Sequence, residues 1–519
     1  MKGTFINTDG TSPLPCRLMN SRLRALCDLM VPTARECCGV HDYDGVLQDL
    51  SPDGVRRGLA ALGGPPEDDP HDEAHVAAFE ANARVVFGEL ELHRVNPLFH
   101  VSNLDLACYD REYAPAAERA AARQRHLGAW PEAIEASIAA LDAVPAPIAR
   151  ATMGAAHGLA VGLDAERSPQ EKAALAAHAR FVAHLERAAL DGDPSVALGT
   201  EALTALLSSA EAIDVDLGEL SRQADAERDC LRAALDEACQ RIAPGEPTTR
   251  TVTALLNDHP DAAGVLSEAQ ALTAEVIAWT AEHDLVPYND GECQVGPAPE
   301  SRQWAMAMMS WAAPYEADGP SWYHVTPPSP DWPAADQEEW LSVFSRTTLP
   351  AITVHEVAPG HFSHGRALRH APTAIRRLLM SDAFIEGWAH YGEQVALEEG
   401  FRADDPRFAA GVAHEALVRV TRLACAIGLH TGTMTVEGAA RRFAEDALLQ
   451  GAAALSEARR GTFEPTYGRY TWGKLAILDI REQAKQAWGA DFSLPRFHRA
   501  LLDLGSPPLG LLSTAIVRG

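Results

Sequence analysis

The pair His355-Glu356, followed by His361, carries the residue types of a zinc hydrolase. Such an enzyme needs two neutral imidazoles on the metal, a third protein ligand, an open position for water, and a carboxylate that takes a proton from that water. The usual spacing places the two histidines at i and i+4, on one face of a helix. Here position i+4 is Pro359 and the second histidine stands at i+6, which an ideal helix would place on the wrong face.

Pro359 and Gly360 predict that the helix loosens between the two histidines. A proline has no N–H to offer the carbonyl four residues back, and a glycine adopts dihedral angles that other residues avoid. A loosened chain could carry His361 back toward the metal, which is a hypothesis at this point. His364 and His390 are the alternative sources of a second imidazole.

A second helix is expected to begin near Ser381 or Asp382 and to end before Gly400. Glu386 and Glu393 lie on one face of this helix, together with other residues at spacings of three and four. If the helix returns antiparallel to the first, Glu386 can supply a third metal ligand. Glu393 could accept a hydrogen bond from a ligand imidazole, and a solvated helix face is the competing interpretation.

Four motifs, in this order along the chain, resemble the domain-of-unknown-function 885 family. They are His355-Glu356-Val-Ala-Pro359-Gly360-His361, Glu386-Gly387-Trp388-Ala389-His390-Tyr391-Gly392-Glu393, Arg422-Leu423 with Gly428-Leu429-His430, and Tyr470-Thr-Trp-Gly473-Lys474-Leu475. The first two match the family signatures HExxPGH and EGWAxYxE. The resemblance implies a helical zinc metallopeptidase, distantly similar to the angiotensin-converting and oligopeptidase-like enzymes, which enclose a deep cleft.

The resemblance implies a role for each residue of the first two motifs that could do chemistry. His355, His361 and Glu386 would be the ligands of Zn²⁺, and Glu356 would be the general base. Glu356 would polarise a water molecule for attack on a carbonyl group and later pass the proton to the leaving amine.

Residues outside the metal helices are candidates for supporting roles. His430 and Tyr470 could donate hydrogen bonds to the oxyanion that forms when water adds to the carbonyl, and packing roles are the alternative for both. Arg422 could pair with Glu393 or with a substrate carboxylate, although an ordinary salt bridge is the default interpretation. Tyr315 could line the cleft.

These assignments predict a zinc-dependent hydrolase that cleaves an amide bond in a small peptide or a related amide substrate. His364 and His390 stand where the family usually has a glutamine and an apolar residue, which motivates a rival reading. That rival is a metal-dependent tailoring enzyme acting on a modified amino acid or a non-ribosomal peptide. A second rival is a non-catalytic helical peptide-binding protein. Two histidines and one carboxylate would also suit iron or manganese.

Composition narrows the range of partners. The chain has 519 residues, and its 72 Asp and Glu outnumber 44 Lys and Arg to give a net charge of −28, which argues against a nucleic-acid partner. No apolar stretch is long enough to span a bilayer, so we expect no membrane segment. Residues Met1–Gly10 do not look like a secretory signal, and the nine cysteines lack C-x-x-C spacing. A cytoplasmic protein with free thiols is therefore expected.

The elements that position these residues are expected to be helices. Between Arg22 and about Leu285 the sequence is rich in Ala, Leu, Glu and Arg, and its apolar positions are spaced three and four residues apart. Between Val286 and Gln337, prolines and aromatic residues predict loops and short strands. We expect a mainly α fold with at most a small β-sheet, built as an N-terminal helical region (1–165) and a helical catalytic region (166–519) that together form one continuous fold around a cleft.

Overall fold

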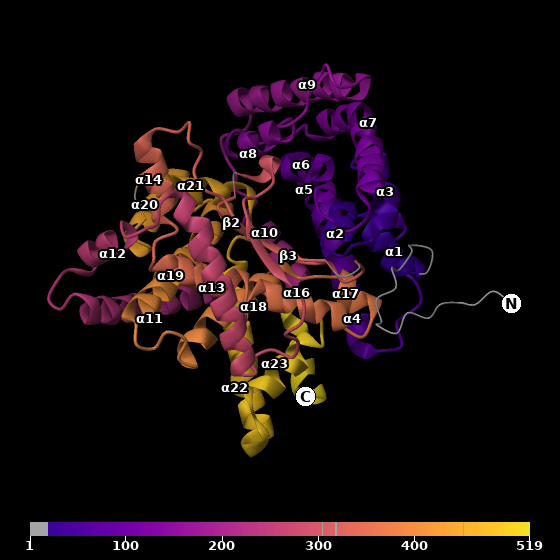
Figure 1. Ribbon diagram of the computed structural model, residues 1–519. Helices are drawn as coiled ribbons and strands as arrows, with labels where there is room; N and C mark the ends of the chain where they lie inside the picture. The colour runs from indigo at the N-terminus through magenta and orange to yellow at the C-terminus, as the bar shows by residue number, and fades with distance from the viewer. Residues whose placement is uncertain (1–18, 304, 317–318, 450) are drawn as a thin grey trace.

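The computed structural model of the protein describes residues 19–303, 305–316, 319–449 and 451–519. The fold is mainly α with one small sheet (Figure 1), which confirms the predicted class. The expectation about Met1–Gly10 falls on residues outside those described.

A first group of helices lies along one side of the molecule, coloured indigo to purple in Figure 1. Its members are α1 (Ser21–Asp28), α2 (Val31–Glu36), α3 (Pro52–Ala60), α4 (Pro70–Ala83), α5 (Leu92–Val95), α6 (Leu98–Leu104), α7 (Ala116–Ala140), α8 (Ala146–Gly158) and α9 (Pro169–Asp191). Trp130 and Ile134 of α7 share a buried cluster with Phe181 and Leu185 of α9. The packing of this group therefore continues past residue 165.

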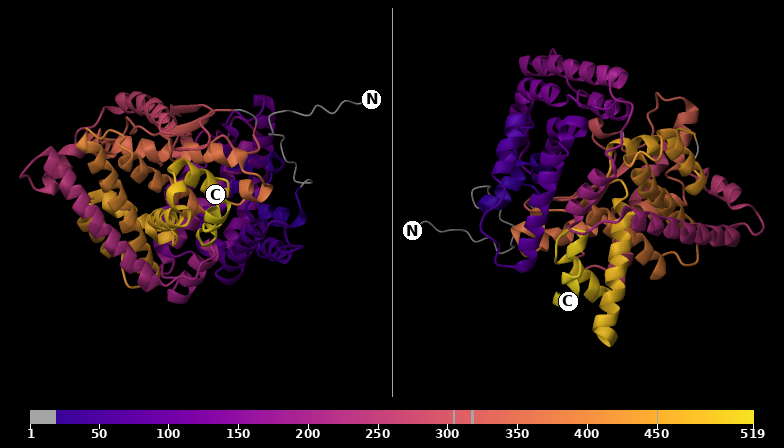
Figure 2. Two further views of the ribbon diagram at one scale, coloured as in Figure 1. Left: turned by 90° about the horizontal axis from the view of Figure 1, so that it is seen from below. Right: turned by 180° about the vertical axis from the view of Figure 1, so that it is seen from behind.

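The later helices lie beside this group rather than over it, as both views in Figure 2 show. They are α10 (Thr200–Glu211), α11 (Leu217–Ile242), α12 (Thr248–Leu256), α13 (Ala262–Glu282), α14 (Ala334–Ser342), α15 (Thr348–Glu356), α16 (His361–His370), α17 (Ala374–Leu378), α18 (Asp382–Glu398), α19 (Pro406–His430), α20 (Val436–Asp446), α21 (Gly451–Phe463), α22 (Arg469–Trp488), α23 (Leu494–Leu502) and α24 (Thr514–Arg518). The long helices α11 and α19 pack together, and Leu235 and Leu423 belong to their shared buried cluster.

The proline-rich segment forms the sheet, as its composition predicted. Its strands are β1 (Cys293–Gly296), β2 (Ala307–Ser310) and β3 (Ser321–Val325), in the order β1-β3-β2. Strand β1 pairs parallel to β3, with Cys293 opposite Ser321, and β2 pairs antiparallel to β3, with Ala307 opposite Val325. Tyr323 and Val325 of β3 pack in one buried cluster with Val354 of α15, so the sheet supports the helix that carries His355.

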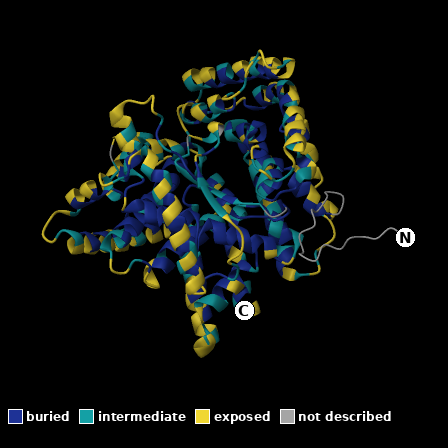
Figure 3. Ribbon diagram, viewed as in Figure 1, coloured by how far each residue is buried: buried dark blue, intermediate teal, exposed yellow. Residues whose placement is uncertain are grey.

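Helices α15 and α18, which carry the metal-centre motifs, lie in a deeply buried part of the later group (Figure 3). Every residue of α15 is buried, as are most residues of α18. Helix α18 begins at the predicted place because the Ser381 side chain accepts a hydrogen bond from the Phe384 N–H, which caps the first turn. The prediction of this helix, from Ser381 or Asp382 to before Gly400, is confirmed.

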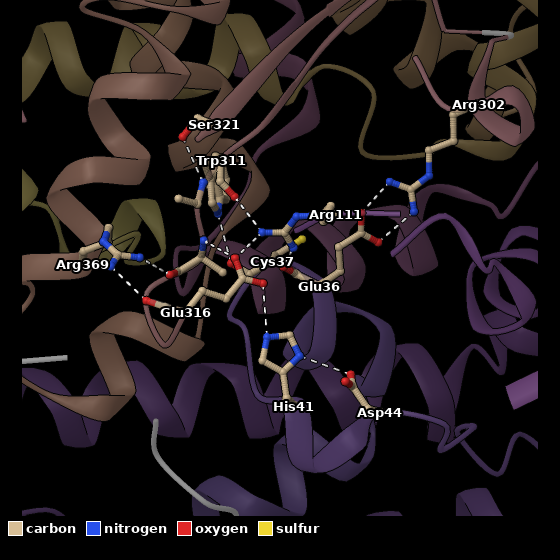
Figure 4. A network of polar contacts seen from close by, with 12 residues as sticks. Glu36, Cys37, His41, Asp44, Arg111, Arg302, Trp311, Glu316, Ser321 and Arg369 are labelled. Atoms are coloured by element: carbon tan, nitrogen blue, oxygen red, sulfur yellow. Dashed lines mark hydrogen bonds and ion pairs between the residues drawn. The ribbon is translucent and has the colours of Figure 1, made fainter. Parts of the chain in front are cut away.

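A network of polar contacts ties the N-terminal helices to the segment around the sheet (Figure 4). Arg302 pairs with Glu36 at 2.5 and 2.8 Å and with Asp105 at 2.7 Å. Arg111 pairs with Glu316, and it also donates to the carbonyl oxygens of Glu36 and Trp311. The two sides of the molecule are therefore joined by charge pairs as well as by apolar packing.

Among the described helices, none combines the length and the apolar character needed to cross a membrane. The described cysteines are all free thiols, as expected; Cys16 lies outside the described residues.

Candidate metal centre

The chain breaks between the two motif histidines, and the break brings them together. Helix α15 ends at Glu356, and α16 begins at His361. A Cβ atom on Gly360 would lie 1.8 Å from the carbonyl oxygen of His355, so only glycine allows the chain to fold back this closely. The imidazole rings of His355 and His361 lie 4.7 Å apart between centroids. The predicted loosening at Pro359-Gly360 is therefore present, and His361 returns to the side of His355.

Glu386 of α18 meets both imidazoles. Its Oε2 lies 3.3 Å from Nε2 of His361 and 3.5 Å from Nε2 of His355. Nitrogen and oxygen ligands held 2.0–2.1 Å from a tetrahedral zinc ion lie about 3.3–3.4 Å from one another. The carboxylate of Glu386 is thus spaced from each of the two imidazole nitrogens as one zinc ligand is from another.

Glu393, about two helical turns after Glu386, fixes the orientation of His355. Its Oε1 lies 2.7 Å from Nδ1 of His355, and its Oε2 accepts a hydrogen bond of 2.8 Å from Arg419. Histidine ligands of metals commonly donate their second N–H to a carboxylate in this way, which leaves Nε2 for the metal. Glu393 has no exposed surface, so the competing interpretation of a solvated helix face is wrong.

The two carboxylates make the cluster favourable for a cation. Burial and the Arg419 charge lower the pKa of His355, but contacts with Glu386 and Glu393 outweigh them and raise it to about 9. Burial raises the pKa of Glu386, yet hydrogen bonds with His355 and His361 bring it well below the usual value for a carboxylic acid. A proton or a metal ion can meet this demand for positive charge, and the donor set of two imidazoles and a carboxylate fits zinc.

Glu356 lies next to the ligand atoms and has an unmatched oxygen. One ligand atom from each of His355, Glu356 and His361 lies within 4.8 Å of the other two. Glu356 is 8% exposed, and its Oε2 has no hydrogen-bond partner among the described residues. Burial raises the pKa of this carboxyl group. An acid placed beside a cation site, with one oxygen unmatched, can take up a proton from a bound molecule.

Tyr470 reaches the centre through a close crossing of two helices. Helices α18 and α22 approach so closely at Gly387 and Gly473 that a Cβ on Gly473 would lie 1.9 Å from a backbone oxygen of α18. This contact brings the Tyr470 ring to 6.3 Å from the His355 ring, at an angle of 27° to it. Burial and the nearby Glu386 raise the pKa of Tyr470, so its hydroxyl keeps its proton.

The two alternative histidines are not brought to the cluster. Nε2 of His364 lies 2.9 Å from the Ser506 hydroxyl oxygen. His390 is buried behind Glu393, with its Nδ1 3.5 Å from Glu393 Oε1. Burial lowers the pKa of both histidines to about 3, which keeps them neutral. His361 is therefore the second imidazole beside His355.

His430 also lies elsewhere. It stands eleven residues after Arg419 in α19, which places it about 16 Å further along the helix axis. Its two ring nitrogens lie 3.1 and 2.9 Å from the carbonyl oxygens of Val196 and Gly461. His430 therefore has a packing role, and the suggested hydrogen bond from His430 to an oxyanion is not supported.

Two further suggestions differ from the structure. Arg422 pairs with Glu457, at 2.7 and 2.8 Å, and not with Glu393. Tyr315 is 5% exposed and packs in a buried cluster with N-terminal residues, so it lines no cleft. Arg419 was missed, and the chain offers no local signal that separates it from Arg422, because the choice depends on how α19 is rotated against α18.

The comparisons with known proteins concern the family and the fold. A model of the family described as "Bacterial protein of unknown function (DUF885)" matches residues 32–516. No curated protein sequence matches the chain.

Two solved structures are similar over nearly the whole chain. One is a "putative lipoprotein of unknown function" from Shewanella oneidensis, with a TM-score of 0.76 at 19% identity over 96% of this chain and 98% of that one. The other is a "putative lipoprotein" from Colwellia psychrerythraea, with a TM-score of 0.76 at 18% identity over 97% of this chain and 99% of that one. At this identity they support the fold alone.

The descriptions of these two structures correct one expectation from the sequence. Lipoproteins are anchored to membranes by lipid and are not cytoplasmic, so the prediction of a cytoplasmic protein is overturned. That prediction came from the lack of an apolar block at the start of the chain, which says nothing about how proteins of the same fold are placed.

Proposed function

The chain belongs to the DUF885 family, and we propose that it is a zinc-dependent hydrolase that cleaves an amide bond in a small peptide. One observation carries the proposal: Glu386 Oε2 lies at zinc-ligand spacing from Nε2 of His355 and Nε2 of His361, and the unmatched carboxylate of Glu356 lies beside them. Buried polar groups without partners are uncommon in folded proteins, so an unmatched acid at such a place needs an explanation.

His355, His361 and Glu386 would hold the metal. Bound there, zinc would act as a Lewis acid and lower the pKa of water. Glu393 holds the His355 ring in place through its contact with Nδ1, and Arg419 holds Glu393 in turn. The side chain of Glu386 is 19% exposed, against 5% for His355 and 9% for His361, so a substrate would approach on the side of Glu386.

Glu356 would move the proton. Its carboxylate accepts a proton from the water molecule that attacks the carbonyl carbon and delivers it to the departing amine. A general base works best when its pKa is close to the working pH, and burial moves the pKa of Glu356 in that direction. The protonated Tyr470, whose ring lies 6.3 Å from the His355 ring, would donate a hydrogen bond to the carbonyl oxygen of the substrate, which becomes negative during the attack.

The two rival functions receive less support. The tailoring-enzyme alternative depended on His364 and His390, which lie away from the ligand atoms. A peptide-binding protein has no use for a buried, unmatched acid at Glu356.

Metal analysis by mass spectrometry on the purified protein tests the first half of the proposal. We expect about one zinc per chain in the wild type, and loss of the metal in His355→Ala and in Glu386→Ala. His370→Ala is the matched control, because His370 lies on α16 but its side chain is 42% exposed and pairs with Asp290. Iron in place of zinc would move the proposal to oxidative chemistry, and no metal after zinc is supplied would refute it.

A peptide library tests the second half. Zinc-loaded wild type should cut at least one class of short peptide, and Glu356→Gln should keep the metal and lose the cleavage. A zinc-loaded wild type that leaves every peptide intact would refute the peptidase assignment.

A further inference from the structure

Three arginines surround the tyrosine that lies beside the metal centre. The Cζ atoms of Arg422 and Arg469 lie 5.0 and 5.2 Å from the centroid of the Tyr470 ring. Arg460 Nη2 lies 3.5 Å from the Tyr470 hydroxyl, and its Cζ lies 4.7 Å from the centroid of the Tyr467 ring. Three guanidinium groups therefore lie around the tyrosine whose ring lies beside His355.

The carboxylates that accept hydrogen bonds from these arginines contact them unequally. Arg422 is fully matched, because both oxygens of Glu457 accept its hydrogen bonds at 2.7 and 2.8 Å. Arg460 and Arg469 share the carboxylate of Glu464, and each contacts the same atom, Oε2, at 3.3 Å. Two guanidinium groups thus share one carboxylate oxygen at a distance longer than a good charged hydrogen bond.

Arg469 has unused hydrogen-bonding capacity. Its Nε is buried and has no partner among the described residues. A bidentate carboxylate uses two parallel N–H groups of a guanidinium, and the contact with Glu464 occupies only one N–H donor of Arg469, at Nη1. A ligand oxygen could therefore accept a hydrogen bond from the buried N–H at Nε.

The position of the pair suits a ligand that reaches the metal centre. The Tyr470 ring connects the pair to the metal centre, because it lies 5.2 Å from Arg469 Cζ and 6.3 Å from the ring of His355. Arg460 is the accessible member, with 34% of its side chain exposed against 14% for Arg469. A ligand arriving from solvent on this side would meet Arg460 before Arg469.

We propose that Arg460 and Arg469 bind the C-terminal carboxylate of a short peptide, so that the enzyme releases residues from the carboxyl end of its substrate. The inference rests on the proposed hydrolase function and names its substrate class. The Tyr470 ring lies 6.3 Å from the His355 ring and 5.2 Å from Arg469 Cζ. An extended residue spans about 3.3–3.6 Å, so one to three residues cover this path.

The reaction balances with water as the only co-reactant. The amide C–N bond breaks, the carbonyl carbon gains the hydroxyl of water, and the leaving nitrogen gains the proton. The released product is an amino acid or a short peptide that carries the bound carboxylate.

Calorimetric binding to the zinc-loaded Glu356→Gln protein tests the carboxylate site without turnover. The probes are Ala-Ala-Ala and its C-terminal amide. We expect the acid to bind about 10- to 100-fold more tightly than the amide, as charged hydrogen bonds are worth. Adding Arg460→Gln or Arg469→Gln should bring the ratio close to one, whereas Arg460→Lys, which keeps the charge, should retain part of it.

Arg459→Gln is the matched control, because Arg459 is exposed and adjacent to Arg460 in α21. This control should keep the full ratio. Ala-Ala-Glu amide distinguishes a terminal carboxylate from a side-chain one: tight binding of this probe would assign the site to acidic side chains and overturn the C-terminal proposal.

The outcomes separate this inference from the proposed function. Peptide hydrolysis by the wild type with equal kcat/KM for acid and amide would overturn the carboxylate site and leave the hydrolase standing. Acid-selective binding that depends on Arg460, in a protein that cuts no peptide, would refute the hydrolase and support the carboxylate site alone.

Discussion

Two clusters of buried charge in this protein differ in whether every charged group has a partner of opposite charge. In the network between the N-terminal helices and the sheet segment (Figure 4), Arg302 has Glu36 and Asp105, and Arg111 has Glu316. In the metal centre, Glu356 keeps an oxygen without a partner.

The difference separates a structural cluster from a functional one. A matched network such as that of Arg302 and Glu36 repays the cost of burying charge only while every partner is present. An unmatched group costs free energy in the folded protein, and such groups persist where a ligand will meet them. Removing a charge should therefore harm stability in the first cluster and activity in the second.

The largest effect is expected from Glu356→Gln in the metal centre. Loss of a general base should lower kcat by about 10²- to 10⁴-fold. The free energy of unfolding should not fall, because a neutral amide replaces a buried acid that lacks a partner. Peptide hydrolysis and chemical denaturation measure the two quantities, with the exposed Glu399→Gln as control. A stable, fully active Glu356→Gln would remove the contrast between the clusters.

Arg302→Met should show the reverse pattern. It removes the guanidinium group that pairs with Glu36 and Asp105, whose side chains are only 22% and 14% exposed. We expect a loss of about 3 kcal/mol in the free energy of unfolding, at the low end for a buried pair because of that residual exposure. Activity per folded molecule should not change. Arg346→Met is the control, because it also removes two ion pairs, with Asp258 and Glu268, but from an arginine that is 42% exposed; it should cost less than about 1 kcal/mol.

Glu393→Gln tests a residue that belongs to both kinds of cluster. Glu393 is fully matched, by Arg419 and His355, yet it orients a metal ligand. Changes to such residues lower metal affinity by about 10- to 100-fold. Competition with a zinc chelator measures this, with Gln394→Ala, half-exposed on the same helix, as control. An unchanged zinc affinity would mean that Glu393 serves only the packing of Arg419.

The sequence predicted those features that depend on neighbouring residues. Pro359 and Gly360 predicted the break between α15 and α16, and Ser381 predicted the start of α18. The partner of Glu393 was not predictable, because Arg419 and Arg422 are three residues apart on one helix and only the rotation of α19 decides which of them faces α18.

The same reason explains the other misses. His430 and Tyr315 were suggested for the site by residue type and motif, but their places depend on contacts with Val196 and with the N-terminal helices, far away in the chain. Arg460 and Arg469 were not predicted as a binding pair, because the sequence does not show whether two arginines contact the same glutamate in the folded protein.

The smallest expected effect is a pH dependence in the matched network. His41 lies 3.2 Å from Asp44 and 3.3 Å from Glu316. Burial lowers the pKa of His41, but its hydrogen bonds with Asp44 and Glu316 outweigh burial and raise it above 6.5. A raised folded-state pKa means that the charged His41 stabilises the protein fully below pH 6.5, and that this contribution is lost as the pH rises through the folded-state pKa. The loss should be below about 1 kcal/mol, because His41 is 26% exposed. Unfolding free energies of wild type and His41→Gln should converge from pH 6 to pH 8. If the difference between the two unfolding free energies widened with pH, His41 would be neutral in the network. Arg111 would then be the cation that pairs with Glu316.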